Sequence, residues 1–272
     1  MIKMKYFICC TILLISTIDL NAADWSPGDA FFRAGFFDYA RYEYLKAYFL
    51  VDGDSNSTLD ISNKIAETYL ADSDYKNGII WCENVLNTVD VPLWHPFQLT
   101  YAVLQMKNRD HVRGIGVLAK YSPQKDFDRN RQNFLLGCAN AHLWNLSEAI
   151  YSWDAIPDTS PFSKLSSDYI QKTRDTMQVS FRNPTTGAVL GVMPGLGYLY
   201  AGHFKTSLSA ITVLSLTTWA TIASFNENVD GIGYLTGFIT VGWYVGSIYG
   251  SYKATDRRNR DLVREYLNEI NY

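Results

Sequence analysis

Three stretches without a charged residue, all between residues 187 and 252, constrain the fold more than any other feature of this chain. They cover residues 187–201, 207–225 and 231–252. The second and third contain 19 and 22 residues, and about 20 apolar residues allow a helix to cross a bilayer. The first stretch is shorter and is interrupted by Pro194-Gly195. The sequence therefore predicts a helical membrane domain over 182–252, with three spans or with two spans and a re-entrant first segment.

The charges around these stretches predict an orientation. Lys205 lies between the first and second stretches, and one lysine and three arginines lie between 253 and 260. The 226–230 turn contains acidic residues but no basic one. Cytoplasmic loops carry the excess of Lys and Arg in membrane proteins. Three crossings, with a basic amphipathic tail over 253–272 in the cytoplasm, satisfy this pattern.

Residues 1–23 have the three parts of a secretory signal peptide. Lys3 and Lys5 precede an apolar run over 6–18, which is too short to span a bilayer. Small residues that suit cleavage follow at Ala22 and Ala23. An uncleaved anchor is the alternative. Either way, the signal predicts that the domain over 24–181 is exported.

A pattern of small residues recurs through this exported part. The small residues are Ala40, Gly78, Gly114 and Ala149, at spacings of 38, 36 and 35. Three positions before each small residue stands an aromatic or apolar residue, or His111 in the third copy. Four positions after each small residue stands another residue that would lie on the same helical face. Another small residue lies 12 positions upstream. Offsets of three and four place residues on one helical face, so the pattern predicts a series of helical hairpins.

The first copy, with Phe37, Ala40, Tyr44 and Ala47, resembles the second helix of the tetratricopeptide repeat. The resemblance covers residues of about 25–161, and an irregular helical bundle is the alternative. It implies an all-α solenoid of stacked helical hairpins. Because stacked pairs form a curved groove, it also implies that the groove binds a peptide or another protein.

A second resemblance begins in the first uncharged stretch. Pro194, Gly195, Gly197, Tyr200 and Gly202 form the motif P-G-x-G-x-x-Y-x-G. This is similar to the motif that opens a small bacterial membrane domain, found behind tetratricopeptide-like repeats in exported and largely uncharacterised proteins. The resemblance implies a bacterial inner membrane and a periplasmic repeat domain, and it brings no chemistry.

Glycines recur at intervals of four in the third stretch, at Gly242, Gly246 and Gly250. Such a ladder lets helix backbones approach closely in lipid. It predicts either packing within this chain or contact with a second copy or another protein's span.

Catalytic and metal-binding patterns do not emerge from the sequence. Its four histidines, His95, His111, His142 and His203, have no zinc-ligand spacing. The polar stretch 52–60 partly resembles a calcium loop, but a turn and a helix cap explain it without metal. The net charge of −3 is spread over interspersed acids and bases, which argues against a nucleic-acid surface. We therefore expect neither cofactor nor metal, and Cys82 and Cys138 to be small buried side chains.

The prediction is a non-catalytic scaffold or adaptor, anchored in the membrane, that binds a protein partner in the cell envelope through its repeats. The alternative is an accessory subunit of a transport or envelope-assembly complex, whose spans make the specific contacts.

Overall fold

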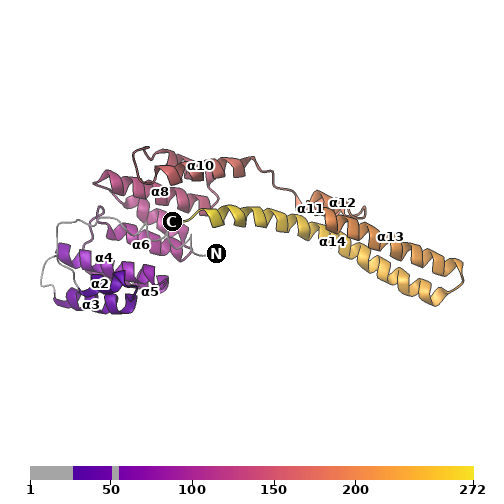
Figure 1. Cartoon of the computed structure of the whole chain (residues 1–272), viewed down its shortest axis with the longest axis horizontal. Coiled ribbons are helices and arrows are strands. Elements are labelled where there is room, and N and C mark those ends of the chain that lie inside the picture. Colours follow the sequence, from indigo (N-terminus) through magenta and orange to yellow (C-terminus); the bar gives the residue numbers. More distant parts are fainter. Residues whose placement is uncertain (1–26, 51–54) are drawn as a thin grey trace. The chain divides into compact units, whose positions relative to one another are not determined.

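The computed structural model describes residues 27–50 and 55–272, and these contain thirteen α-helices and no strand (Figure 1). The predicted all-α class is thus confirmed for the described residues. The predicted signal over 1–23 and residues 52–54 of the polar stretch lie outside them.

The chain divides into two compact units. The repeat unit contains the residues up to Arg174 together with Ile270–Tyr272, and the hairpin unit contains Asp175–Glu269. The hairpin unit is therefore an insertion between two parts of the repeat unit. The domain boundaries predicted from the sequence lie instead at 181/182 and 252/253.

Helical hairpins make up most of the repeat unit. Its helices are α2 (Pro27–Arg33), α3 (Phe37–Leu50), α4 (Ser55–Ala71), α5 (Tyr75–Thr88), α6 (Phe97–Lys107), α7 (His111–Lys120), α8 (Asp126–His142) and α9 (Leu146–Asp154), and α10 (Ser163–Gln178) runs past its boundary. Consecutive pairs from α2/α3 to α8/α9 pack together, and α3, α5 and α7 each contact the helix that follows. This arrangement agrees with the predicted hairpins, while membership of the tetratricopeptide family stays a prediction.

One turn geometry recurs six times in the described chain. In each turn a single residue has a positive φ, between 59° and 88°, five positions before a small residue. The six residues are Gly35, Ser73, Arg109, Trp144, Gly202 and Asn228. The N–H after each one bonds the carbonyl five residues earlier, as Asp74 N does to Tyr69 O at 3.0 Å. This is the helix ending in which two otherwise unpaired carbonyls are satisfied by residues just beyond the helix.

The small residues that the sequence marks lie where the two helices of a hairpin approach most closely. Ala40, Gly78, Gly114 and Ala149 are all buried. A Cβ on Gly78 would lie 2.8 Å from the Cβ of Tyr69. The upstream small residue has the same role, since a Cβ on Gly137 would lie 2.2 Å from Nε1 of Trp153.

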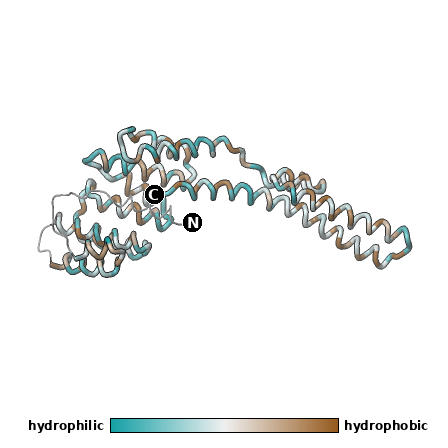
Figure 2. The backbone as a smooth tube through the Cα atoms, in the orientation of Figure 1, coloured by the Kyte–Doolittle hydropathy of each residue, from teal (hydrophilic) through white to brown (hydrophobic). Residues whose placement is uncertain are grey.

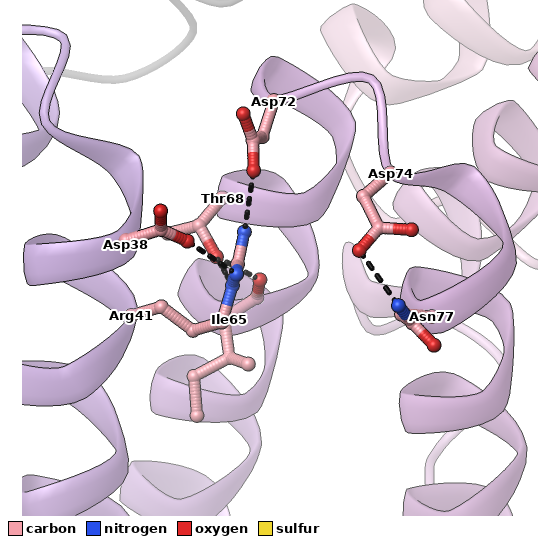
Figure 3. A network of polar contacts seen from close by, with 7 residues as sticks. All are labelled: Asp38, Arg41, Ile65, Thr68, Asp72, Asp74 and Asn77. Atoms are coloured by element: carbon pink, nitrogen blue, oxygen red, sulfur yellow. Dashed lines mark hydrogen bonds and ion pairs between the residues drawn. The ribbon is translucent and has the colours of Figure 1, made fainter.

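Arg41 joins the first hairpin to the second (Figure 3). From α3, its guanidinium donates to Thr68 Oγ1 at 3.1 Å and to Asp72 at 3.3 Å, both on the α4 side. It also donates to Asp38 of its own helix at 2.9 Å and lies 3.9 Å from the ring centroid of Tyr69. Five donors on a planar group allow one arginine to make all these contacts.

The hairpin unit contains α11 (Pro184–Leu190), α12 (Leu196–Tyr200), α13 (Phe204–Asn226) and α14 (Asp230–Glu269). Among the described residues, α13 alone is a helix long and apolar enough to be a candidate membrane span. It packs against α14. Apolar residues occur along α13 and along the first part of α14, and the later part of α14 is more polar (Figure 2).

The first predicted span does not form one helix. Residues 187–202 fall into α11 and α12, of seven and five residues, and at 1.5 Å per residue these measure about 10 Å and 8 Å. Neither reaches across a hydrocarbon core of about 30 Å. The predicted three-span domain is therefore not supported at its first span. The predicted separate tail also differs, because 253–269 simply continue α14.

Replacing Gly137 by Ala tests the close approach within a hairpin. The new methyl group would overlap the buried indole of Trp153, so we expect a loss of about 1 to 3 kcal/mol in the free energy of unfolding. Gly116→Ala is the matched control, because Gly116 is exposed on α7 with nothing within 4 Å of a Cβ. Its helix should gain about 0.5 to 1 kcal/mol. Denaturant melts of the full chain in detergent measure both, and equal stability of the two variants would contradict this packing.

Candidate functional site

Residues Ile270–Tyr272, which we call the 270–272 segment, pack in the repeat unit. The helices α6, α7, α8 and α10 supply the side chains and carbonyls that contact it. Ile270 is 1% exposed, whereas Asn271 is exposed and Tyr272 half-buried. The segment thus fills a site built by the ends of two hairpins and the helix that follows them.

Tyr169 of α10 holds the main chain of the segment. Its hydroxyl accepts from Asn271 N at 2.9 Å and donates to Asn271 O at 3.0 Å. His142 Nε2 lies 3.3 Å from Ile270 O, and because a carbonyl only accepts, this nitrogen carries the proton. These three contacts are made to main-chain atoms of residues 270 and 271.

Aromatic packing fixes the Tyr169 hydroxyl in place. Its ring is buried and stacks on Phe134 at a centroid distance of 5.9 Å. Trp153 meets the same ring edge-on at 5.4 Å and donates from Nε1 to Phe134 O at 3.2 Å. A hydroxyl held this way loses little further freedom when it binds a peptide, which favours binding.

Tyr272 is held at both its hydroxyl and its ring. The hydroxyl donates to Met106 O, a carbonyl of the last turn of α6, at 2.9 Å. Lys107 Nζ lies 4.4 Å from the ring centroid. The rings of His142 and His111 meet it edge-on at 5.5 Å and 6.2 Å. The Tyr272 hydroxyl therefore has a hydrogen-bond acceptor, Met106 O, and its ring has a cationic neighbour, Lys107.

His111 and His142 stack on each other with centroids 4.6 Å apart and planes 12° apart. Burial, followed by the nearby His142, lowers the pKa of His111 to about 4. Burial also lowers the pKa of His142. No sequence spacing relates these two histidines, because 31 residues separate them and only the stacking of hairpins brings them together.

The 270–272 segment corrects the predicted topology. Its contacts with α6, α8 and α10 require the segment and the repeat unit to be on the same side of any membrane. The predicted arrangement, with the repeat domain in the periplasm and the 253–272 tail in the cytoplasm, is incompatible with them. The prediction of opposite sides combined the export signal with the positive-inside bias, and a crossing by residues 187–202 followed from these two.

A strip of polar contacts crosses the first helices of the hairpins. Lys64 Nζ lies 2.8 Å from Asp29, Asn63 donates to Glu67 at 3.0 Å, and Thr100 donates to Asn63 at 2.7 Å. Burial raises the pKa of Glu67. Such a strip offers both signs of charge along the repeat unit.

The P-G-x-G-x-x-Y-x-G motif packs α11 and α12 against α14. Gly195 begins α12 with a φ of 83°, a conformation that favours glycine. A Cβ on Gly197 would lie 2.4 Å from both Gly187 O and Ser251 Oγ. Tyr200 Oη accepts from Asn183 N at 3.1 Å, and Gly202 is one of the six positive-φ turn residues. Pro194 is exposed. Turn geometry and close packing account for the glycines of the motif.

The glycine ladder divides into two parts. A Cβ on Gly250 would lie 1.9 Å from Tyr198 Oη, so Gly250 packs within the unit. Gly242 and Gly246 are exposed and have nothing within 4 Å. They line an apolar groove of about 670 Å³ together with residues such as Phe238 of α14 and Val213 of α13. Packing within the chain therefore does not explain these two glycines.

The described part of the chain contains no cluster of side chains suited to metal binding or to thiol chemistry. No group of three or more His, Cys, Asp or Glu side chains there could hold a metal ion. Cys82 and Cys138 are free and buried, as predicted. Burial raises the pKa of both thiols, and a thiol kept protonated is a poor nucleophile.

Comparisons of this chain with protein-family models, with curated proteins and with solved structures found no match.

Acidification is expected to weaken the repeat unit. His111 has a pKa of about 4 in the fold against an ordinary 6.5, so the unfolded chain binds the proton more readily. Stability is then complete above about pH 6.5 and falls as the pH drops toward 4, by roughly 1 to 2 kcal/mol after allowance for partial exposure. His142, Asp110, Lys107 and Tyr272 are the ionisable neighbours.

Denaturant melts of the full chain at several pH values measure this loss. The variant His111→Gln should show a smaller fall over the same range. Superimposable pH profiles for the wild type and the variant would contradict the assignment.

Proposed function

We propose that this protein is a non-catalytic adaptor, anchored in a bacterial inner membrane, that binds a protein partner in the cell envelope through its helical repeats. The observation that carries the proposal is the packing of the 270–272 segment in the repeat unit. A repeat unit that holds a peptide by main-chain bonds from Tyr169 and His142 has the chemistry that peptide recognition needs.

The hairpin of α13 and α14 supports the anchoring role. Large apolar side chains on both helices face outward, among them Trp219 at 69% and Phe238 at 80% exposure. An apolar surface of this kind marks contact with a membrane or with another protein. The 22 uncharged residues at 231–252 would extend about 33 Å as a helix. We propose that α13 and the first half of α14 enter the bilayer as a two-span hairpin.

An even number of crossings returns the chain to the side on which it entered. This agrees with the 270–272 segment packing in the repeat unit. We propose that residues 1–23 export the chain and that the repeat unit and residues 253–272 both lie on the outer side. The basic residues at 253–260 then lie outside, against the usual bias. The contacts of the segment with the repeat unit support this placement.

Cysteine labelling of intact cells tests the topology. Ser122→Cys in the repeat unit and Arg257→Cys on α14 should both react with a membrane-impermeant maleimide. Glu227→Cys, in the turn between α13 and α14, should react only after permeabilisation. All three positions are exposed, and the native Cys82 and Cys138 are buried. Opposite reactivity of the Ser122→Cys and Arg257→Cys variants would contradict the proposal.

A second candidate function is an accessory subunit of a larger membrane complex. The apolar groove with Gly242 and Gly246 in its lining favours it, since a helix of another protein or of a second copy could approach the bare backbone there. In this case the specific contacts lie in the hairpin unit and not in the repeats.

Crosslinking of the full chain in its own membrane, followed by mass spectrometry, separates the two functions. The adaptor predicts crosslinks from a partner to repeat-unit lysines such as Lys76 and Lys120, and they should persist in the double variant Gly242→Leu, Gly246→Leu. A Cβ at either position has no atom of this chain within 4 Å, so we expect both variants to keep the fold of the hairpin unit.

The accessory function instead predicts crosslinks near Lys205 and Lys253 that the double variant abolishes. Gly231→Leu is the control, because Gly231 is also exposed on α14 with no neighbour within 4 Å. An absence of any crosslinked protein from the repeat unit would contradict the adaptor.

A further inference from the structure

We propose that the apolar groove between α13 and α14 binds one anionic phospholipid, with an acyl chain in the groove and the phosphate at the end nearest Lys205 and Lys253. The groove lies within the hairpin unit and has a volume of about 670 Å³, which is in the range of small-molecule sites. The proposal rests on the anchoring hairpin of the proposed function and names a lipid that this hairpin holds.

The lining of the groove changes from apolar to polar along its length. Because α13 and α14 pack together and are joined by the 226–230 turn, residue number reports the distance from that turn. From Phe238 to Ser247 the helix rises about 14 Å. Nearer the turn the lining includes Phe238, Ile239 and Val213, and farther from it Thr206, Ser209 and Ser247. An acyl chain suits the first end, and ester and phosphate oxygens suit the second.

Gly242 and Gly246 lie between these two ends. Both line the groove, and a Cβ on either would have no atom within 4 Å. The main chain of α14 is therefore bare there, and a methylene chain can lie against it. Phe238 and Trp243, at 80% and 56% exposure, stand beside the two glycines. A helix with its side chains is about 10 to 12 Å across and would have to displace these bulky groups, whereas an acyl chain is much thinner.

The charges of the hairpin favour an anionic ligand at the polar end. Between residues 198 and 253 the charged residues are Lys205, Glu227, Asp230 and Lys253. The two acids lie at the turn, beyond the apolar end of the groove. Lys205 is exposed and directly precedes Thr206 of the lining. A headgroup phosphate at the polar end thus has two lysines and no carboxylate of this stretch near it, as in basic sites for anionic lipids between membrane helices.

Lys253 lies on the same face of α14 as the floor of the groove. Spacings of four, three and four residues connect Gly242, Gly246, Tyr249 and Lys253, and such spacings place residues on one helical face. Nζ of Lys253 lies 5.5 Å from the ring centroid of Tyr249, which is one helical turn nearer the groove. The lysine therefore reaches back toward the polar end.

Ser247 adds an unpaired hydroxyl group to the polar end. The residue lines the groove at 7% exposure, and its Oγ is buried without a hydrogen-bond partner. A hydroxyl without a partner is costly in an apolar environment. A lipid ester carbonyl at this end supplies an acceptor after a rotation about χ1 of Ser247.

Native mass spectrometry of the full chain released from detergent tests the proposal. The chain is titrated with phosphatidylglycerol, which is anionic, and with phosphatidylcholine of the same acyl chains, which has no net charge. We expect one phosphatidylglycerol per chain, bound at least fivefold more tightly than phosphatidylcholine.

Filling the groove tests the place of the acyl chain. The double variant Gly242→Leu, Gly246→Leu should lower the affinity for both lipids at least tenfold, because the leucine side chains occupy the floor. Gly231→Leu is the matched control, since Gly231 is exposed on the same helix, has no neighbour within 4 Å and is outside the lining. It should bind both lipids like the wild type.

Neutralising the lysines tests the place of the headgroup. The double variant Lys205→Gln, Lys253→Gln should bind the two lipids equally, with its affinity for phosphatidylcholine within twofold of the wild type. Arg264→Gln removes an exposed charge farther along α14 and should keep the preference for phosphatidylglycerol. Ser247→Ala should weaken both lipids two- to fivefold, because it removes the donor to the ester group.

Three results would overturn the lipid site. One is unchanged binding of phosphatidylglycerol to the double leucine variant, and another is equal affinity of the wild type for the two lipids. The third is a wild-type dimer that the double leucine variant converts to a monomer, because a second copy would then be the occupant of the groove.

The lipid site and the anchor fail separately. Alkaline carbonate extraction of membranes shows whether the hairpin is embedded in the bilayer. A chain that stays in the membrane pellet but binds no phosphatidylglycerol would refute the lipid site and leave the anchor. A chain that carbonate releases, yet that binds phosphatidylglycerol with the expected variant pattern, would refute the anchor and leave the groove assigned.

Discussion

The turn with one positive-φ residue, five positions before a small residue, is the constraint on which both units depend. It ends one helix, satisfies two of its last carbonyls, and starts the next helix so that the small residue meets its neighbour. Ser73, Arg109, Trp144 and Asn228 accept this conformation despite the steric cost to residues with a Cβ. The close approach that follows leaves no room for a methyl group at Gly78 or Gly137. Because the same turn joins α12 to α13 and α13 to α14, the hairpin unit uses the geometry of the repeat unit.

The sequence predicted the helices and hairpins well because a period of three and four reports local burial. Ala40 and Ala149 stand out by size and spacing, and the structure buries both completely. It predicted less well where the outcome depends on distant contacts. The uncharged residues 187–202 resemble a span, but they form two short helices, separated by a turn that contains Pro194 and Gly195 with its φ of 83°. Uncharged composition is shared by membrane spans and by tightly packed turns, so charge alone could not separate the two.

The candidate site illustrates the same limit more sharply. Its parts come from Met106, His111, His142 and Tyr169 and from the 270–272 segment, with up to 166 residues between contacting atoms. No spacing in the sequence relates these positions, so a search for motifs passes over them. A local clue existed, since Ile270 lies on the apolar face of the predicted 253–272 helix. The sequence predicts a cytoplasmic tail there, and the burial of Ile270 in the repeat unit depends on the insertion of the whole hairpin unit between Arg174 and Ile270.

Because the hairpin unit is inserted before it, the 270–272 segment brings the end of the chain back to the repeat unit. Residues 175–269 leave the repeat unit and return to it, so packing the segment closes a long loop. The cost of closing such a loop grows only slowly with its length, and it is further reduced if α13 and α14 are held together as a hairpin. The bonds from Tyr169, His142 and Met106, together with the burial of Ile270, can therefore hold the loop closed.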